Sequence, residues 1–386
     1  MGAVSGAVTD EPTRAVPAGE VERRYRLIRE AMARDGLDAV IACGTEYTGF
    51  DGGVIYLSGF AIVHRYAYVL LPLEGDPSIV FPREATYVGE HGTTWIDEQV
   101  FVDRPGEWLA DRIKGTRVGV YGLDYVMTVR DYAVLEGVAE IVPWDMQFDH
   151  ARAVKSELEL ESVRDSVRIN TEGFWIFLEH FAPGKSEREI LAHCEKYFVE
   201  QGCGRLTMDM VLVGDGGAAL PEFKIAGDYA IKVSDMVLPS LEIAGVGGHW
   251  VEVSRAICAG VPSTETAQMM EAYEEYYDAA RSALKDGATA HDVHRAVSQG
   301  FLDRGFTLGH VTGHSIGMTM IEWPKIGEGD ETELRESMIF SMHPHAISPD
   351  GKACLYMQDT WQVTKDGGVP LAGLPMKIFD GTESRS

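Results

Sequence analysis

The chain reads Gly313-His314-Ser315-Ile316-Gly317 at its most informative point. Small residues on both sides of His314 allow a backbone to come close to a ligand and leave the imidazole accessible. Polar segments of the same kind precede and follow it: Val251-Glu252-Val253-Ser254-Arg255, Ile321-Glu322-Trp323-Pro324, Phe340-Ser341-Met342-His343-Pro344 and Tyr356-Met357-Gln358-Asp359-Thr360. We expect polar side chains from these segments to meet in one cleft.

The order and spacing of these segments resemble the creatinase/aminopeptidase P/methionine aminopeptidase family. The resemblance implies an α+β pita-bread catalytic domain, preceded by a smaller α/β domain of the creatinase type. In the metal-dependent members of that family, two aspartates on a hairpin, one histidine and two glutamates hold two metal ions. The matching positions here hold Ser240 or Glu242 for the first aspartate, Glu252 for the second, His314 for the histidine, and His343 and Gln358 for the glutamates.

The charge of these side chains disfavours a centre with two metal ions. Two divalent cations about 3.5–4 Å apart need several carboxylates to offset their mutual repulsion. The positions supply one or two carboxylates, two imidazoles and an amide. Imidazole suits a single transition-metal ion, so a mononuclear site of His314, His343 and either Glu252 or Glu242 is the alternative. The favoured interpretation is a site without a metal or another cofactor.

Composition limits the class of partner. The chain has 386 residues, which suggests two domains. Its net charge of −26, from 60 acidic and 34 basic residues, argues against nucleic acid or an anionic membrane as a partner. Five cysteines without paired spacing are typical of reduced thiols. Because no apolar run of transmembrane length and no signal peptide is evident, we expect a cytoplasmic protein.

The spacing of apolar residues divides the chain into three parts. Residues 1–20 are predicted to be a flexible tail, and residues 21–152 alternate helix and strand, which indicates an α/β domain. Ser156 and Glu159 form a capping box that opens a long helix, so the catalytic domain is predicted to comprise residues 153–386. The arms of a hairpin are expected at residues 236–242 and 249–259, and later strands at 310–317, 337–345 and 354–363.

Candidate catalytic residues are acids and histidines of these segments. Glu252 stands among apolar and aromatic neighbours, where the pKa of a carboxylate is raised toward the range useful for proton transfer. The resemblance also gives Glu222 the position of the central histidine of creatinase-like chemistry. The complete candidate set is Glu252, His314, His343, Glu242 and Glu222.

A second group of residues is predicted to bind substrate: Gln358, Arg65, Glu322, Trp250 and His345. The amide of Gln358 can orient a carbonyl or an amide of the substrate. Trp250 could line an apolar pocket or contact a cation. The resemblance implies a homodimer in which Arg65 reaches the active site of the partner subunit and binds an anionic group.

The sequence favours a metal-independent, creatinase-like hydrolase that cleaves a C–N bond of a small polar metabolite such as an amidine, guanidine, lactam or cyclic amidine. Side chains alone would then transfer the protons, and peptidase activity is not expected. One alternative is a mononuclear metal-dependent hydrolase or lyase of the same fold. Another is a non-catalytic relative that binds a peptide or a small molecule.

Overall fold

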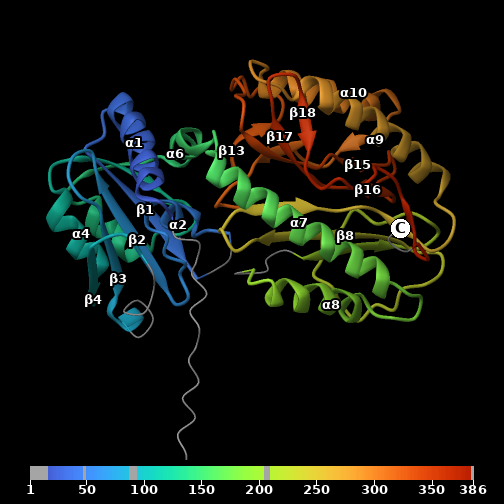
Figure 1. Ribbon diagram of the computed structural model, residues 1–386, viewed down its shortest axis with the longest axis horizontal. Coiled ribbons are helices and arrows are strands. Elements are labelled where there is room, and N and C mark those ends of the chain that lie inside the picture. Colours follow the sequence, from blue (N-terminus) through green and yellow to red (C-terminus); the bar gives the residue numbers. More distant parts are fainter. Residues whose placement is uncertain (1–15, 47–48, 87–93, 204–208, 384–386) are drawn as a thin grey trace, which may run out of the picture.

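The computed structural model describes residues 16–46, 49–86, 94–203 and 209–383. They form two domains that lie side by side, each with its own sheets and helices (Figure 1). Helix α6, Asp145–Arg152, ends the N-terminal domain, and α7, Glu157–His180, begins the C-terminal domain. The boundary predicted near residue 153 falls between these two helices. None of the described helices has the length and apolar character that crossing a membrane requires.

The N-terminal domain is a mixed six-stranded sheet with the strand order β4-β3-β2-β1-β5-β6. Helices α1, α2 and α6 contribute Ile28, Leu57 and Phe148 to the apolar core on one face. Helices α4 and α5 contribute Leu109 and Leu135 to the core on the other face. The strands are β1 Ala39–Thr45, β2 Tyr66–Pro72, β3 Ser78–Pro82, β4 Glu98–Val102, β5 Arg117–Tyr121 and β6 Glu140–Pro143, and the helices are α1 Ala18–Asp35, α2 Gly52–Ser58, α4 Pro105–Ile113 and α5 Val129–Leu135, with a short 3-10 turn at Arg83–Ala85.

Helix α1 shows where the predicted tail is wrong. Its first residue is Ala18, so residues 18–20 belong to a helix and not to a flexible segment. Residues 1–15 lie outside the described part of the chain. The helix ends at Gly36, whose φ of 65° is left-handed and is readily adopted by glycine. The following strand, β1, pairs with β2 and β5 in the centre of the sheet.

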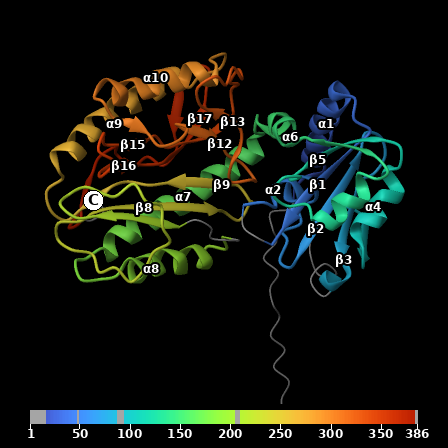
Figure 2. The ribbon, with the colours of Figure 1, turned by 180° about the vertical axis from the view of Figure 1, so that it is seen from behind.

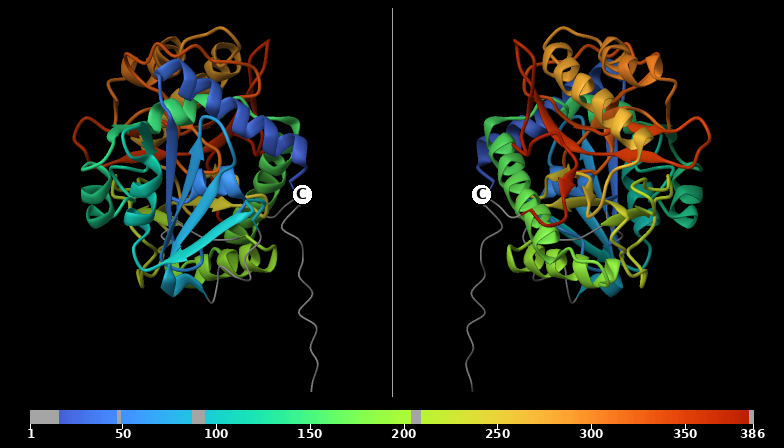
Figure 3. Two further views of the ribbon diagram at one scale, coloured as in Figure 1. Left: turned by 90° about the vertical axis from the view of Figure 1, so that its left-hand side faces the viewer. Right: turned by 90° about the vertical axis from the view of Figure 1, so that its right-hand side faces the viewer.

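The C-terminal domain holds its strands between two pairs of helices (Figures 2 and 3). Helices α7 and α8 share one apolar core with β7, β8 and β9. Helices α9 and α10 share a second core with β14, β16 and β17. The elements are α8 Glu187–Glu200, α9 Thr264–Ala283, α10 Ala290–Asp303, β7 Met210–Gly214, β8 Met236–Ala244, β9 Trp250–Val253, β10 Ile257–Cys258, β11 Thr307–Leu308, β12 Gly313–Ser315, β13 Glu322–Ile326, β14 Ile339–Met342, β15 His345–Ile347, β16 Cys354–Tyr356, β17 Asp359–Val363, β18 Gly368–Pro370 and β19 Phe379–Asp380.

Capping boxes fix the starts of α7 and α8, and the box at α7 was predicted from the sequence. Ser156 Oγ accepts a hydrogen bond from the Glu159 backbone N–H at 3.2 Å, and the Glu159 carboxylate accepts one from the Ser156 backbone N–H at 2.9 Å. Ser186 and Glu189 repeat this arrangement at α8. Each box satisfies backbone N–H groups that have no partner inside the helix.

The strand predicted at residues 337–345 is two strands in the structure. Strand β14 ends at Met342 and pairs with β12 and β17, whereas β15 begins at His345 and pairs with β11 and β16. Pro344 lies between them and has no N–H to donate to a sheet. His343 therefore sits at the break between two sheets.

Candidate functional site

Three pairs of strands bring the candidate residues together. In the β8–β9 hairpin, Glu242 lies directly opposite Glu252. Strand β12 carries His314, which lies opposite Ser341 of β14. His343 follows β14 immediately, and Gln358 precedes the first residue of β17. All five candidate side chains, Glu242, Glu252, His314, His343 and Gln358, are buried.

Glu252, His314 and His343 form a compact group, which we call the metal triad. Glu252 Oε1 lies 3.4 Å from His314 Nε2, and Glu252 Oε2 lies 3.9 Å from His343 Nε2. The three ligand atoms all lie within 4.8 Å of one another. Ser341 Oγ donates a hydrogen bond of 2.6 Å to Glu252 Oε2 and so orients the carboxylate. Two imidazoles and one carboxylate are a donor set for one transition-metal ion.

The electrostatics of the metal triad favour an ionised carboxylate. Burial tends to raise the pKa of Glu252, but the charges of His314 and His343 and hydrogen bonds from His314 and Ser341 bring it down to about 2. Burial tends to lower the pKa of His314, and Glu252 raises it above its ordinary value. Burial lowers the pKa of His343 to about 3. A metal ion requires a carboxylate and neutral imidazoles, so its binding would release the proton that Glu252 stabilises on His314.

The position of a second ion is filled by hydrogen-bonded side chains. Gln358 Nε2 donates to Glu252 Oε2 at 2.8 Å and to Glu242 Oε1 at 2.9 Å. Ser240 Oγ donates to Gln358 Oε1 at 2.8 Å, and the same hydroxyl lies within hydrogen-bond distance of Glu242 Oε1, at 3.0 Å. Burial and the charge of Glu252 raise the pKa of Glu242 well above its ordinary value, so this carboxyl is neutral. An amide and a neutral carboxyl do not offset a second divalent charge. The residues present fit one ion and do not fit two.

Five rings at and beside the metal triad form an imidazole–aromatic cluster of Phe223, His310, His343, His345 and Tyr356. The ring centroids of His310 lie 5.0 Å from His343 and 5.4 Å from His345. Phe223 lies 5.1 Å from His345 and 4.9 Å from Tyr356. Sequence reasoning missed Phe223, His310 and Tyr356. Two signals were available in the sequence. His310 is a second histidine, four residues before His314, and Tyr356 is two residues before Gln358, so it shares one face of the predicted strand with it.

Two predicted residues lie apart from this site. Glu222 is exposed, and among the described residues no hydrogen bond or ion pair links it to the metal triad. Arg65 is exposed on the N-terminal domain and has a φ of 65°, which is uncommon for a residue other than glycine. Its backbone N–H donates to Glu46 at 2.8 Å. The homodimer in which Arg65 would reach the partner's site stays a prediction.

Glu322 and Trp250 lie in packed surroundings, and their role in substrate binding stays a prediction. Glu322 is fully buried between the domains, 3.0 Å from Arg152 and 3.1 Å from Lys155. Asp149 also pairs with Arg152, at 2.8 Å. Both oxygens of Glu322 are thus engaged by cations of the domain junction. Trp250 belongs to the apolar core shared by α7, α8 and the β8–β9 hairpin.

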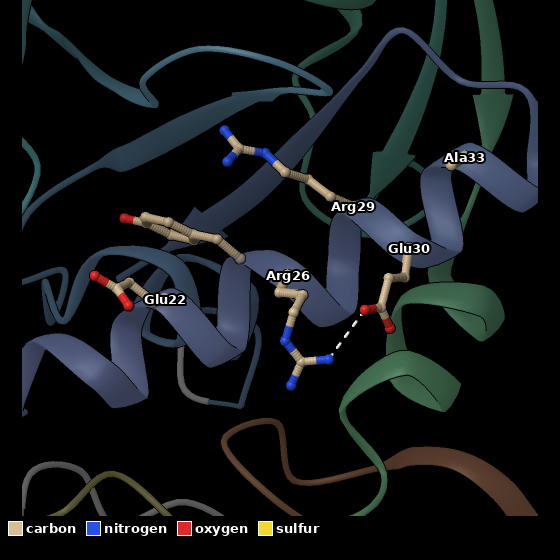
Figure 4. Close-up of a pocket in the computed structure, with 6 residues that line it drawn as sticks. Glu22, Arg26, Arg29, Glu30 and Ala33 are labelled. Carbon is tan, nitrogen blue, oxygen red and sulfur yellow. Dashed lines mark hydrogen bonds and ion pairs between the residues drawn. The ribbon is translucent and has the colours of Figure 1, made fainter.

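A groove on the outer face of α1 is unrelated to these residues (Figure 4). It is lined by Glu22, Tyr25, Arg26, Arg29, Glu30 and Ala33. Arg26 and Glu30 form an exposed ion pair of 3.0 Å across it. Exposed pairs of this kind contribute little to stability, and the groove contains none of the candidate site residues.

Comparison with known proteins supports the fold and corrects the predicted function. The chain is similar to the Xaa-Pro dipeptidase of Pyrococcus horikoshii, with 26% identity over 90% of this chain and 96% of that protein. It is 24% identical to the probable dipeptidase PepE of Mycobacterium tuberculosis over 92% of this chain and 96% of that protein. Among solved structures, the prolidase of Pyrococcus horikoshii OT3 covers 92% of this chain and 99% of its own, with 22% identity and a TM-score of 0.78. The dipeptidase PepE of Mycobacterium ulcerans covers 94% and 98%, with 23% identity and a TM-score of 0.80.

These relatives overturn two predictions. A metal-independent, creatinase-like hydrolase is wrong as the main interpretation, because the relatives are named as dipeptidases and the matching family is one of metallopeptidases. The expectation that peptidase activity is absent is wrong for the same reason. The expectation of no metal is corrected by the metal triad. The predicted fold is confirmed: residues 24–154 match the Creatinase/Prolidase N-terminal domain and residues 161–365 match metallopeptidase family M24, so the chain belongs to that family.

Proposed function

We propose that this protein is a metal-dependent hydrolase that cleaves the amide bond of a dipeptide or a similarly small peptide, and that it uses one transition-metal ion. The observation that carries the proposal is the metal triad, whose three ligand atoms lie within 4.8 Å of one another. Support also comes from relatives named as Xaa-Pro dipeptidases along most of the chain. The hydrogen bonds of Gln358 and Ser240 favour one ion over two.

The chemistry of the site divides between the ion and the side chains. When bound, a divalent ion of this type polarises a carbonyl group and lowers the pKa of water. Ser341 holds the carboxylate of Glu252 in place. The His314 Nδ1 atom is 2.9 Å from the Ser315 carbonyl oxygen, which fixes the tautomer and leaves Nε2 facing Glu252.

Glu242 is suited to act as the proton donor of the reaction. Its carboxyl keeps a proton near neutral pH, because burial and Glu252 raise its pKa. In the hydrolysis, water adds to the amide carbon, the C–N bond breaks, and the leaving nitrogen takes a proton. Glu242 would supply that proton and recover one from the water that adds. The products are a carboxylic acid and an amine.

The test measures metal content and activity on the same sample. We expect one transition-metal ion per chain, hydrolysis of at least one dipeptide from a panel that includes Xaa-Pro dipeptides, loss of activity with a chelator, and recovery after one equivalent of metal. Glu252→Gln should abolish both metal binding and turnover. His193→Asn is the control, because His193 is exposed on α8 and distant from the metal triad. Peptide hydrolysis that survives complete removal of metal, or an absence of bound ion, would refute the proposal.

A further inference from the structure

The hydroxyl of Tyr356 occupies a defined place in the hydrogen-bond network of the site. The negative charge of Glu252 lies 2.8 Å from Gln358 Nε2, so the NH₂ group and not the oxygen of the amide must face it. Ser240 donates to the other end of the amide and supports the same orientation. Gln358 Nε2 is also 3.0 Å from the Tyr356 hydroxyl. An amide nitrogen accepts no hydrogen bond, so the Tyr356 hydroxyl does not use its own hydrogen in this contact.

The hydrogen of the Tyr356 hydroxyl has no acceptor among the residues that the structure describes. Tyr356 is only 4% exposed, so bulk water does not compensate for the missing bond. Burial raises the pKa of Tyr356 well above its ordinary value, which keeps the hydroxyl protonated. A buried donor without an acceptor is unfavourable by about 1–3 kcal/mol. Such a group at the edge of a candidate active site indicates a ligand atom.

Other atoms of the imidazole–aromatic cluster support a ligand at the same place. His345 Nε2 and His343 Nδ1 are also buried and have no hydrogen-bond partner in the described part of the chain. Their rings lie 5.4 and 5.8 Å from the ring of Tyr356. Phe223, 38% exposed, contacts Tyr356 and brings the cluster to the protein surface. The cluster thus has polar atoms inside and an apolar ring at its outer end.

The polar atoms of this cluster suit an uncharged group. Among the described residues, no lysine or arginine makes a hydrogen bond, ion pair or cation–π contact with the rings of Phe223, His343, His345 or Tyr356. A carboxylate of the substrate would find no cation here, whereas an amide carbonyl needs only a donor.

We propose that Tyr356 is a catalytic residue whose hydroxyl donates a hydrogen bond to the carbonyl oxygen of the substrate's amide, an assignment that rests on the proposed function. One amide nitrogen, Gln358 Nε2, separates this hydroxyl from the carboxylate of Glu252. A bond to that oxygen becomes stronger as water adds and the oxygen gains negative charge. A preorganised donor of this kind acts on the transition state more than on the bound substrate.

The experiment compares Tyr356→Phe with a matched control. Tyr276→Phe removes the same atom from another buried tyrosine, on α9, whose hydroxyl has no hydrogen-bond partner among the described residues. For Tyr356→Phe we expect kcat to fall roughly 100-fold, in line with loss of one oxyanion donor, with KM within about twofold and one metal ion still bound. A phosphinic dipeptide analogue, which mimics the tetrahedral state, should bind at least tenfold more weakly to this variant by calorimetry. Tyr276→Phe should match the wild type in each measurement.

A double-mutant cycle separates catalysis by Tyr356 from positioning of Gln358. If the hydroxyl contacts the substrate, Tyr356→Phe lowers kcat by a similar factor in the wild type and in Gln358→Met. If the second substitution has no effect in the Gln358→Met background, Tyr356 only positions the amide and the assignment is overturned. An active wild type with an unchanged kcat in Tyr356→Phe overturns it as well. A wild type that neither binds metal nor cleaves any dipeptide refutes the proposed function itself, and the assignment of Tyr356 with it.

Discussion

Replacing Gln358 with glutamate is the most direct test of the charge balance in the site. Gln358 Nε2 lies 2.8 Å from Glu252 Oε2, so the substitution puts two carboxylates in contact. At an effective dielectric constant of 20, two unit charges at this distance of 2.8 Å repel by about 6 kcal/mol. The new carboxyl can avoid this repulsion by taking up a proton. For a glutamate of ordinary pKa, protonation at pH 7 requires roughly 4 kcal/mol, which sets the upper limit of the destabilisation.

A second divalent ion should remove that destabilisation. In chelator, Gln358→Glu is expected to lower the free energy of unfolding by up to roughly 4 kcal/mol. With excess manganese, cobalt or zinc, the stability should return, because an ion that binds only the folded state stabilises it. The number of ions per chain should rise from one to two. Urea unfolding at pH 7, with and without metal, and elemental analysis measure these quantities.

Gln358→Met is the control for this substitution. It removes the same hydrogen bonds without adding charge, so it should lose stability whether or not metal is present and should bind a single ion. Two outcomes would refute the charge balance described above. One is a Gln358→Glu protein as stable in chelator as the wild type, and the other is a variant that binds no additional ion at millimolar metal.

Three further substitutions test two buried polar groups and a helix cap that are not members of the metal triad. Asp359→Asn leaves Arg255, its buried partner at 2.6 Å, without a counter-charge, and should lower the free energy of unfolding by about 3 kcal/mol in urea. Burial lowers the pKa of His345 to about 4, so the unfolded chain binds this proton more tightly. Stability in chelator should therefore rise by roughly 3 kcal/mol between pH 4 and 6.5, and His345→Asn should lack that contribution. Ser156→Ala removes the cap of α7 and should lower stability by about 1 kcal/mol.

For each substitution, one result would contradict the prediction. If Asp359→Asn is as stable as the wild type, the backbone carbonyl groups that accept hydrogen bonds from Arg255 are enough to compensate for burial of its charge. An unchanged difference between pH 4 and 6.5 in His345→Asn would assign the pH dependence to other groups. Ser186→Ala, at the second capping box, should show a loss similar to that of Ser156→Ala; no loss in either would contradict the role of the boxes.

Local patterns predicted those parts of the molecule that short-range interactions determine. The capping box at Ser156, the glycine end of α1 and the β8–β9 hairpin all depend on residues close in sequence. The family resemblance, carried by the order and spacing of the motif segments, pointed to the residues of the metal triad. The hairpin register then showed which of two residues faces Glu252, because Glu242 and not Ser240 lies opposite it. The register of a hairpin depends on the length of its turn and on packing. The sequence alone did not determine either of these for β8 and β9.

Long-range pairing explains what the sequence did not reveal. Glu322 and Lys155 are separated by 167 positions, so no local pattern showed that this carboxylate would be engaged at the domain junction. Phe223 and His310 reach the site from segments outside the strands, where periodicity gives no direction. The functional prediction failed at another step. Scarce carboxylates do argue against two ions, but a single ion needs only Glu252 and two imidazoles.

The buried charges at the domain junction have a thermodynamic consequence for the imidazole of His314, which lies on the neighbouring strand. Glu322, bound by Arg152 and Lys155, lies opposite Ser315 in the β12–β13 pair, next to His314. The docking of one domain on the other and the alignment of a metal ligand thus share a single strand pair. Linkage between two such equilibria is reciprocal. If docking of the N-terminal domain strengthens metal binding, metal binding must stabilise the docked arrangement by the same free energy. A substitution that weakens the contacts at the domain junction should therefore lower the affinity for the metal ion, although it changes none of the metal ligands.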